Sequence, residues 1–248
     1  TIRTESGKSF FFFFGYWSDT HLMLGDDGYL YCFYRGNAMP SSYLNTSVGF
    51  HARAIVYKKS KDGVNWSQNR IFVYSTTTSS NDKDIGLMSP AITKNGSIYH
   101  KYELVDGNVS GLILTGENQT QRVIVHTISK DIVSGYSEIN QDAVVNFKNR
   151  PWGTSKDVWH VDAHKFGNAY FLLLNVGNIG ANGGDDLYLA YSGDGWNFQV
   201  ITTPIALSNR YRSSITPFYE NGKFGFLILE SVKPEGSLKL KKLTLKNL

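Results

Sequence analysis

Polar and apolar residues alternate over residues 158–164, which predicts a β-strand with one wet face and one dry face. On such a strand His160, Asp162 and His164 share a face, although the flanking residues are apolar or aromatic. Three ionisable side chains are costly to bury unless they are paired or used by the protein. We therefore expect other strands to bring polar side chains opposite this one.

The same plan recurs four times along the chain. A strand marked by polar residues leads through a glycine turn into an aromatic strand, a pattern typical of β-hairpins. The hairpins cover residues 18–34, 87–102, 159–174 and 211–227, and their turn glycines are Gly28, Gly96, Gly167 and Gly222. This spacing suits one four-stranded propeller blade with loops per repeat.

The sequence thus predicts an all-β protein, a single β-propeller domain over residues 1–248. Third strands are expected near residues 51–59, 122–129, 186–192 and 239–245, and the second repeat should run over residues 84–147. The fourth repeat lacks a fourth strand, which residues 7–14 can supply, closing the ring and removing both sheet edges. Four blades are the main interpretation, and a five-bladed ring is the alternative if a long loop folds as strands.

A second repeated motif lies at residues 60–66 and 192–198, which both read S-x-D-G-x-x-(W/F), with a degraded copy at residues 129–131. In such a turn the Asp carboxylate accepts backbone N–H groups, Gly adopts a positive φ, and the aromatic residue packs on the sheet. The motif resembles the Asp-box turn of sialidases and other glycoside-hydrolase propellers. Asp62 and Asp194 are therefore expected to be structural.

The first strand of each propeller blade lines the central axis, so equivalent positions should converge at one mouth. The candidate ligand-binding residues are Asp19, His21, Ser89, Trp159, His160, Asp162, Tyr211 and Arg212. Such a mouth suits sugars, because aromatic rings stack on C–H faces and polar groups bind hydroxyls. The alternatives are that the His and Asp residues only pair with one another, and that Arg212 pairs with a structural Asp. Trp152 is either a sugar-stacking loop residue or a core anchor.

The order S-D-x-H, S-P-A, W-H-x-D and Y-R-S, each followed by an aromatic hairpin, resembles the glycoside-hydrolase-type five-bladed propeller superfamily. That group includes arabinanases, β-xylosidases and fructan hydrolases, and the resemblance is greatest to phage-borne receptor-binding propeller domains. The family's enzymes use a base Asp, a pKa-tuning Asp and an acid Glu on successive inner strands. Asp19 matches the first, Ser89 stands at the second, and Asp162 replaces the Glu. If the protein is an enzyme, the resemblance implies that Asp19 and Asp162 are catalytic.

Two function hypotheses follow. The main one is a carbohydrate-binding propeller, a phage tail receptor-binding domain that recognises a bacterial cell-surface or wall glycan. It would be located on the virion tail or be extracellular, and analogy with tail-fibre heads suggests a homotrimer. The alternative is a glycoside hydrolase that acts on a plant or microbial polysaccharide.

Composition narrows the partners further. The net charge is +4, and several lysines lie near the C-terminus. They indicate either a lysine-bearing edge strand or a surface that attracts an anionic polymer. Basic and aromatic residues are not interleaved as nucleic-acid binding requires, and the Phe run at residues 10–14 is too short for membrane insertion. The single cysteine, Cys32, reads as a buried structural thiol and excludes a disulfide within the chain. We expect no cofactor and no protein-bound metal, with a channel cation held by His and carboxylate groups as the open alternative.

Overall fold

The computed structural model describes residues 2–3, 9–12, 18–40, 51–77, 90–106, 122–136, 144–178, 185–232 and 237–245. All regular structure in these residues is β, as predicted. A membrane-spanning apolar helix is absent from this part of the chain.

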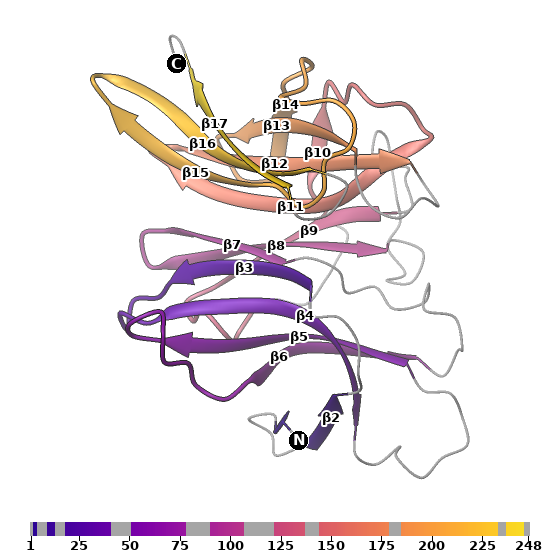
Figure 1. Ribbon diagram of the computed structural model, residues 1–248, viewed down its shortest axis with the longest axis vertical. Coiled ribbons are helices and arrows are strands. Elements are labelled where there is room, and N and C mark those ends of the chain that lie inside the picture. The colour runs from indigo at the N-terminus through magenta and orange to yellow at the C-terminus, as the bar shows by residue number, and fades with distance from the viewer. Residues whose placement is uncertain are drawn as a thin grey trace.

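The strands form four sheets that follow one another along the chain (Figure 1). Sheet one contains β1 (Ile2–Arg3), β2 (Ser9–Phe12), β3 (Ser18–Leu24), β4 (Leu30–Pro40), β5 (His51–Ser60) and β6 (Arg70–Thr77). Sheet two contains β7 (Pro90–Asn95), β8 (Ile98–Asp106) and β9 (Arg122–Ser129). Sheet three contains β10 (Asn146–Lys148), β11 (Lys156–Phe166), β12 (Ala169–Asn178), β13 (Asp186–Ser192) and β14 (Asn197–Val200). Sheet four contains β15 (Ser214–Glu220), β16 (Lys223–Val232) and β17 (Ser237–Thr244).

The four predicted hairpins are confirmed as the antiparallel pairs β3–β4, β7–β8, β11–β12 and β15–β16. Their turn glycines have φ angles of +74°, +60°, +55° and +73°, a region that side chains with a Cβ rarely adopt. The predicted third strands are confirmed as β5, β9, β13 and β17. Local turn chemistry and periodicity therefore define the repeat.

The repeated Asp turns also have the expected geometry. Asp194 Oδ1 accepts the backbone N–H groups of Trp196 and Asn197, both at 2.8 Å, and Gly195 has a φ of +81°. Asp62 accepts the corresponding N–H groups of Val64 and Asn65 at 2.8 and 2.7 Å. The Asp62 turn joins β5 to β6 and the Asp194 turn joins β13 to β14, the third and fourth strands of their repeats.

Two strand partners differ from the prediction. Strand β2, expected to close the ring beside the last repeat, pairs instead with β1 and with the end of β4. It can do so because β4 continues to Pro40, beyond the segment that pairs with β3, and offers a free edge there. In Figure 1 the N-terminus and the C-terminus lie at opposite ends of the row of sheets. The number of blades and the closure of a ring stay predictions.

Strand β10, expected to complete sheet two, pairs in parallel with β14 of sheet three. The chain does touch sheet two just before this strand, because Val145 N–H donates to Ile124 O at 2.8 Å. It then crosses over, and Asn146 N–H donates to Trp196 O at 3.0 Å. Burial of Phe147 beside Phe198, with ring centroids 6.4 Å apart, favours this crossing.

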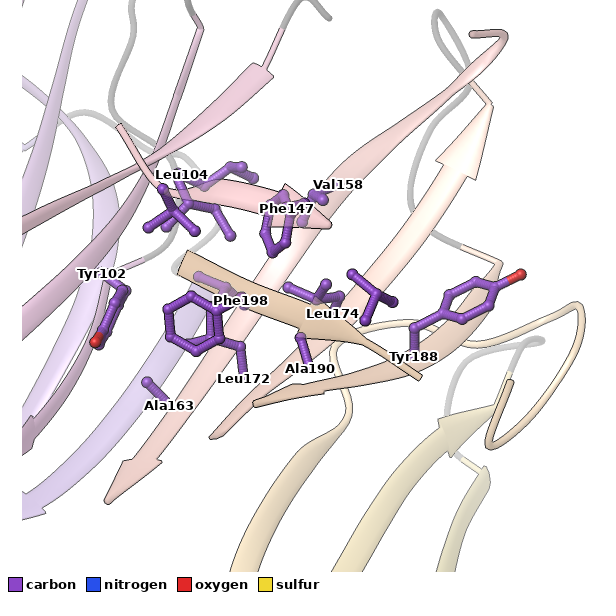
Figure 2. Close-up of a cluster of buried hydrophobic side chains, with 14 of the residues drawn as sticks. Tyr102, Leu104, Phe147, Val158, Ala163, Leu172, Leu174, Tyr188, Ala190 and Phe198 are labelled. Carbon is purple, nitrogen blue, oxygen red and sulfur yellow. The ribbon is translucent and has the colours of Figure 1, made fainter. Parts of the chain in front are cut away.

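Neighbouring sheets pack face to face, and among the described residues three hydrophobic clusters lie between them. Leu172 and Leu174 of β12 belong to the core shared with sheet two, whereas Phe171 and Leu173 belong to the core shared with sheet four. The continuous apolar run of β12 is explained by this burial on both faces. Figure 2 shows the core between sheets two and three, with Tyr102 and Leu104 on one side and Phe198 near Leu172 on the other.

Trp152 belongs to the same core. It is 5% exposed, and its ring lies 5.4 Å from that of Tyr188 and 6.1 Å from that of Phe147. Of the two alternatives left by the sequence, the core anchor is the one observed. Cys32 is buried, as expected.

Candidate functional site

A pocket of about 270 Å³ lies where the first strands of the four repeats meet. Its lining comes from β3, β7, β11 and β15 and from the residues just before β15. The ionisable residues in this lining are Asp19, His21, His160, Asp162, His164 and Arg212. The inner strands therefore converge at one mouth, and five of the eight predicted binding residues lie together there.

Asp19 is the centre of a buried ionic network. Its Oδ2 lies 2.8 Å from Arg35 Nε, and its Oδ1 lies 2.9 Å from Arg212 Nε and 3.0 Å from His160 Nδ1. Burial by itself raises the pKa of Asp19, but the His160 hydrogen bond and the two guanidinium charges outweigh it and hold that pKa well below its usual range. The carboxylate is thus ionised at neutral pH, and its side chain has no exposed surface.

The backbone is irregular at both ends of the Asp19–Arg212 contact. Asp19 has a φ of 65° and Arg212 a φ of 53°, values that are uncommon for residues with a side chain. The pairing of β3 with β4 also shifts register between Ser18 and His21. Bulges and left-handed residues re-aim side chains and collect at functional sites. Here they direct an acid and its arginine toward the same pocket.

Asp162 is held by a second set of contacts. Its Oδ2 accepts the Ile215 N–H at 2.9 Å, and its Oδ1 accepts the Ala163 N–H at 3.0 Å. His21 Nδ1 and His164 Nε2 lie 3.5 and 3.6 Å from the carboxylate oxygens. Burial opposes ionisation, but the two histidines more than compensate and hold the pKa of Asp162 well below its usual range.

The two histidines beside these acids join neighbouring sheets. His21 Nε2 lies 3.0 Å from Ile92 N and 2.8 Å from Ile92 O, so the ring connects β3 to β7. The ring of His160 meets that of Tyr211 edge to face, with centroids 4.9 Å apart. Burial lowers the pKa of His160 although Asp19 acts in the opposite direction. The neutral ring can then donate its Nδ1–H to Asp19.

Two predicted residues lie outside the pocket lining, and the position of a third is not described. Trp159 does not line the pocket, because it alternates with His160 along β11 and its indole packs against the core that contains Val161 and Ala163. The guanidinium carbon of Arg122 lies 3.6 Å from the centre of the Trp159 ring. Tyr211 is outside the pocket lining and contacts it through the His160 ring. Ser89 lies outside the described residues.

Sequence reasoning missed Arg35, which comes from the aromatic strand β4 rather than from an inner strand. Its signal is a lone charge that ends the aromatic run of β4. It also missed the hydroxyl side chains of Thr20, Ser214 and Thr216, which line the pocket and are exposed. The sequence shows that these hydroxyl residues alternate with other residues along their strands. It does not show which face of each strand would be exposed in the pocket.

The carboxylates of Asp19 and Asp162 are both bound by protein groups, so the groups that the site offers to a ligand are mainly hydrogen-bond donors. The side chains of Arg212 and His164 are 22% and 28% exposed, whereas that of Asp162 is 12% exposed. Such a surface suits hydroxyl and anionic oxygen atoms of a ligand. In the part of the chain that the structure describes, no cluster of three or more His, Cys, Asp or Glu could hold a metal ion.

No protein-family model matches the sequence, and no curated protein matches it either. Solved structures do match the fold. An N-acetylgalactosamine deacetylase from F. plautii has a TM-score of 0.60 at 16% identity over 88% of this chain and 63% of its own. The GH43 BlXynB protein from Bacillus licheniformis has a TM-score of 0.54 at 14% identity over 97% of this chain and 42% of its own. A GH32 β-fructofuranosidase from Bombyx mori has a TM-score of 0.54 at 14% identity over 93% of this chain and 46% of its own.

These likenesses show the fold. The chain spans less than two thirds of the length of each of these solved proteins. The protein shares the all-β, propeller-type fold of carbohydrate-active enzymes that include glycoside hydrolases.

Proposed function

We propose that the protein binds a carbohydrate in the pocket at the meeting point of its inner strands. The observation that carries this proposal is the enclosed Asp19 network, which holds Arg212 of the pocket lining in a fixed position and has Arg35 as a further partner of Asp19. Guanidinium groups held in this way bind ligand oxygen atoms without first losing side-chain freedom. Exposed hydroxyls of Thr20, Ser214 and Thr216 add groups that can both donate and accept, as sugar hydroxyls require.

The proteins that share the fold support this ligand class. The deacetylase was solved with blood group B trisaccharide, and the β-fructofuranosidase with sucrose. Sequence identity to the deacetylase and the β-fructofuranosidase is low. The proposal that this chain also binds a carbohydrate therefore rests on the shared fold and on the hydrogen-bond donors in the pocket.

A glycoside hydrolase is the second candidate, and the likeness to the GH43 and GH32 structures favours it. Hydrolysis by two carboxyl groups requires one of them to be protonated as the acid. Asp19 and Asp162 are both held ionised, and the Asp19 carboxylate is enclosed. A catalytic role would therefore be that of a base or of a positioning group, with the proton donor supplied by another residue or by the substrate. Binding is the role that the geometry supports better.

Binding is tested by titrating neutral and acidic oligosaccharides into the protein in a calorimeter. Arg212→Met should weaken any sugar bound in the pocket at least about tenfold, the effect of one charge-assisted hydrogen bond. Thr216→Val is a milder second variant that removes only a hydroxyl from the lining. Arg210→Met is the matched control, because Arg210 pairs with Glu230 and is outside the pocket lining. Equal affinities in all variants, or no sugar bound by the wild type, would overturn the proposal.

Hydrolysis is tested with aryl glycosides and with plant and microbial polysaccharides. If the second candidate is right, the wild-type protein releases product, and Asp19→Asn or Asp162→Asn abolishes the release. An inactive wild-type protein that still binds sugar leaves recognition as the function.

The biological setting is also part of the proposal. We propose a bacterial cell-surface or wall glycan as the target and the virion tail or the extracellular space as the location, on the resemblance of the sequence motifs alone. Sedimentation with isolated cell walls tests the first, and light scattering tests the proposed homotrimer. Failure to sediment with walls from any of a panel of bacteria would remove this setting and leave sugar binding intact.

A further inference from the structure

A second pocket, of about 400 Å³, lies on sheet one, on the face that is turned away from sheet two. It is lined by Thr20, Cys32, Tyr34, Lys58 and Asn69. Alternate residues of β4 and β5 point to opposite faces of the sheet, and Tyr31, Phe33 and Tyr57 face the core shared with sheet two. The pocket therefore opens on the face that is turned away from that core.

The two pockets share a wall. Thr20 lines both of them, and Leu22, the next residue on the same face of β3, lines the first pocket and is 55% exposed. A ligand that occupies the first pocket can thus continue past Thr20 onto the outer face of sheet one. Chains of linked sugars have this extended shape.

The second pocket carries a positive charge. Lys58 Nζ lies 4.9 Å from the centre of the Trp66 ring and 5.9 Å from that of Tyr34. Its neighbour Lys59 pairs with Asp27 at 3.1 Å, whereas no carboxylate of the described residues pairs with Lys58. The Tyr34 hydroxyl donates to Asn69 Oδ1, which leaves the Asn69 amide nitrogen as a further donor. The pocket thus combines a cation, an amide donor and one aromatic ring, that of Tyr34, and the Trp66 ring lies beside the cation.

We propose that this second pocket binds an anionic substituent of the glycan whose neighbouring unit occupies the first pocket. The inference rests on the proposed function and adds the class of ligand: a saccharide chain that carries a carboxylate, sulfate or phosphate group. The Lys58 ammonium neutralises the anion, and the Asn69 amide donates to one of its oxygen atoms. The Tyr34 ring, which lines the pocket, offers a face for the sugar unit that bears the anion.

A competing use of Lys58 is purely local, since an ammonium group between two aromatic rings is stabilised by cation–π attraction. In that case Lys58 has no effect on the choice of ligand. The two roles for Lys58 predict different binding. If Lys58 binds an anion, the protein prefers the acidic version of a saccharide to the neutral one, and if its role is local, Lys58 contributes no such preference.

The experiment uses matched saccharide pairs and the full chain. The pairs are xylohexaose with and without a glucuronic acid branch, dextran with and without sulfate, and mannan with and without phosphate. The wild type should bind the acidic member of at least one pair about tenfold more tightly, as one charge-assisted contact provides. Which pair shows the preference distinguishes carboxylate, sulfate and phosphate. Salt should reduce the preference.

The variants locate the preference. Lys58→Gln should remove it and leave the affinity for the neutral member unchanged, and Asn69→Asp should reverse it by placing a negative charge in the pocket. Lys223→Gln, an exposed lysine on the hairpin of sheet four, removes the same charge elsewhere and should have no effect. Thermal unfolding of each variant verifies that it is folded.

The outcomes separate the two proposals. If a neutral saccharide binds in an Arg212-dependent manner and its acidic partner binds no more tightly, the second pocket is refuted and sugar binding stands. A preference that survives Lys58→Gln refutes it as well, because the anion then binds elsewhere. If neither member of any pair binds, both proposals fail together.

Discussion

Asp19 Oδ1 and Arg212 Nε are 2.9 Å apart, although Asp19 lies in the first inner strand and Arg212 just before the last. This contact joins sheet one to the start of sheet four at the first pocket. Asp162 adds a second link, because its carboxylate accepts the N–H of Ile215 in β15. The pocket and the arrangement of the sheets therefore depend on the same ionised groups.

Asp19→Asn keeps the size of the side chain and removes its charge. Arg35 and Arg212 would then face each other without an anion, and breaking a buried ion pair from one side costs about 3 kcal/mol or more. We expect the free energy of unfolding, measured in urea, to fall by about that amount at neutral pH.

The matched control for that experiment is Asp26→Asn. Asp26 pairs with Lys94 on the surface, and its side chain is 60% exposed, so solvent screens the pair. If both variants lose the same stability, the Asp19 network is not the structural link that its geometry indicates.

The two Asp turns should differ in how much they contribute to stability. Gly195, in the turn of Asp194, lies against sheet two, and its carbonyl oxygen accepts a hydrogen bond from the Tyr102 hydroxyl at 3.1 Å. A Cβ at Gly63, in the turn of Asp62, would meet nothing within 4 Å. Asp194→Ala should therefore lower the melting temperature more than Asp62→Ala, because it disturbs an interface as well as a turn. Equal shifts in calorimetry would show that the interface does not depend on the turn.

Much of this fold could be predicted from the sequence because its information is local. Glycine turns and alternating residues define the hairpins, and the Asp turns carry their own hydrogen bonds. The polar side chains of the inner strands could be aligned by repeat, which brought Asp19 and His160 to the same mouth. Their meeting in one pocket follows from the repeated hairpin plan.

The remaining features depend on contacts that local patterns do not encode. Strand β2 found a free edge created by the length of β4, and β10 crossed between sheets to bury Phe147. Arg35 reached Asp19 from a neighbouring strand, β4. Each outcome is decided by competition between tertiary partners, which a pattern along one strand does not include.

Gly225 in β16 is required by close packing rather than by its backbone angles. A Cβ at this position would lie 2.1 Å from the backbone oxygen of Leu243 and 2.8 Å from the Phe218 ring. Gly225→Ala must push β17 away from β16, and we expect a loss of about 1–3 kcal/mol, the usual cost of overpacking. Gly193→Ala, where a Cβ meets nothing within 4 Å, should change stability little. Urea unfolding compares the two, and equal stabilities would contradict the packing argument.

A buried histidine pair between sheets two and three predicts acid sensitivity. His100 Nδ1 lies 2.8 Å from His126 Nε2, and the His126 ring stacks on Tyr102 at 4.4 Å between centroids. Burial lowers the pKa of His100 to about 4 and that of His126 to about 3. In the unfolded chain both have a pKa near 6.5, so the unfolded state binds more protons below that pH. The stability that the two neutral histidines contribute is therefore fully present above pH ~6.5. It is lost as the pH falls toward the pKa values that they have in the folded protein.

The size of the effect follows from the same linkage. Each histidine that stays neutral in the folded state contributes a loss of about 1.4 kcal/mol for every pH unit below its unfolded pKa. His126→Phe keeps an aromatic ring in the stack and removes one titrating group. Between pH 7.5 and 5.0, urea unfolding should show a shallower loss of stability in His126→Phe than in the wild type. An unchanged slope in His126→Phe would mean that the pair takes up protons within the folded protein, and that the interface between sheets two and three tolerates the charge.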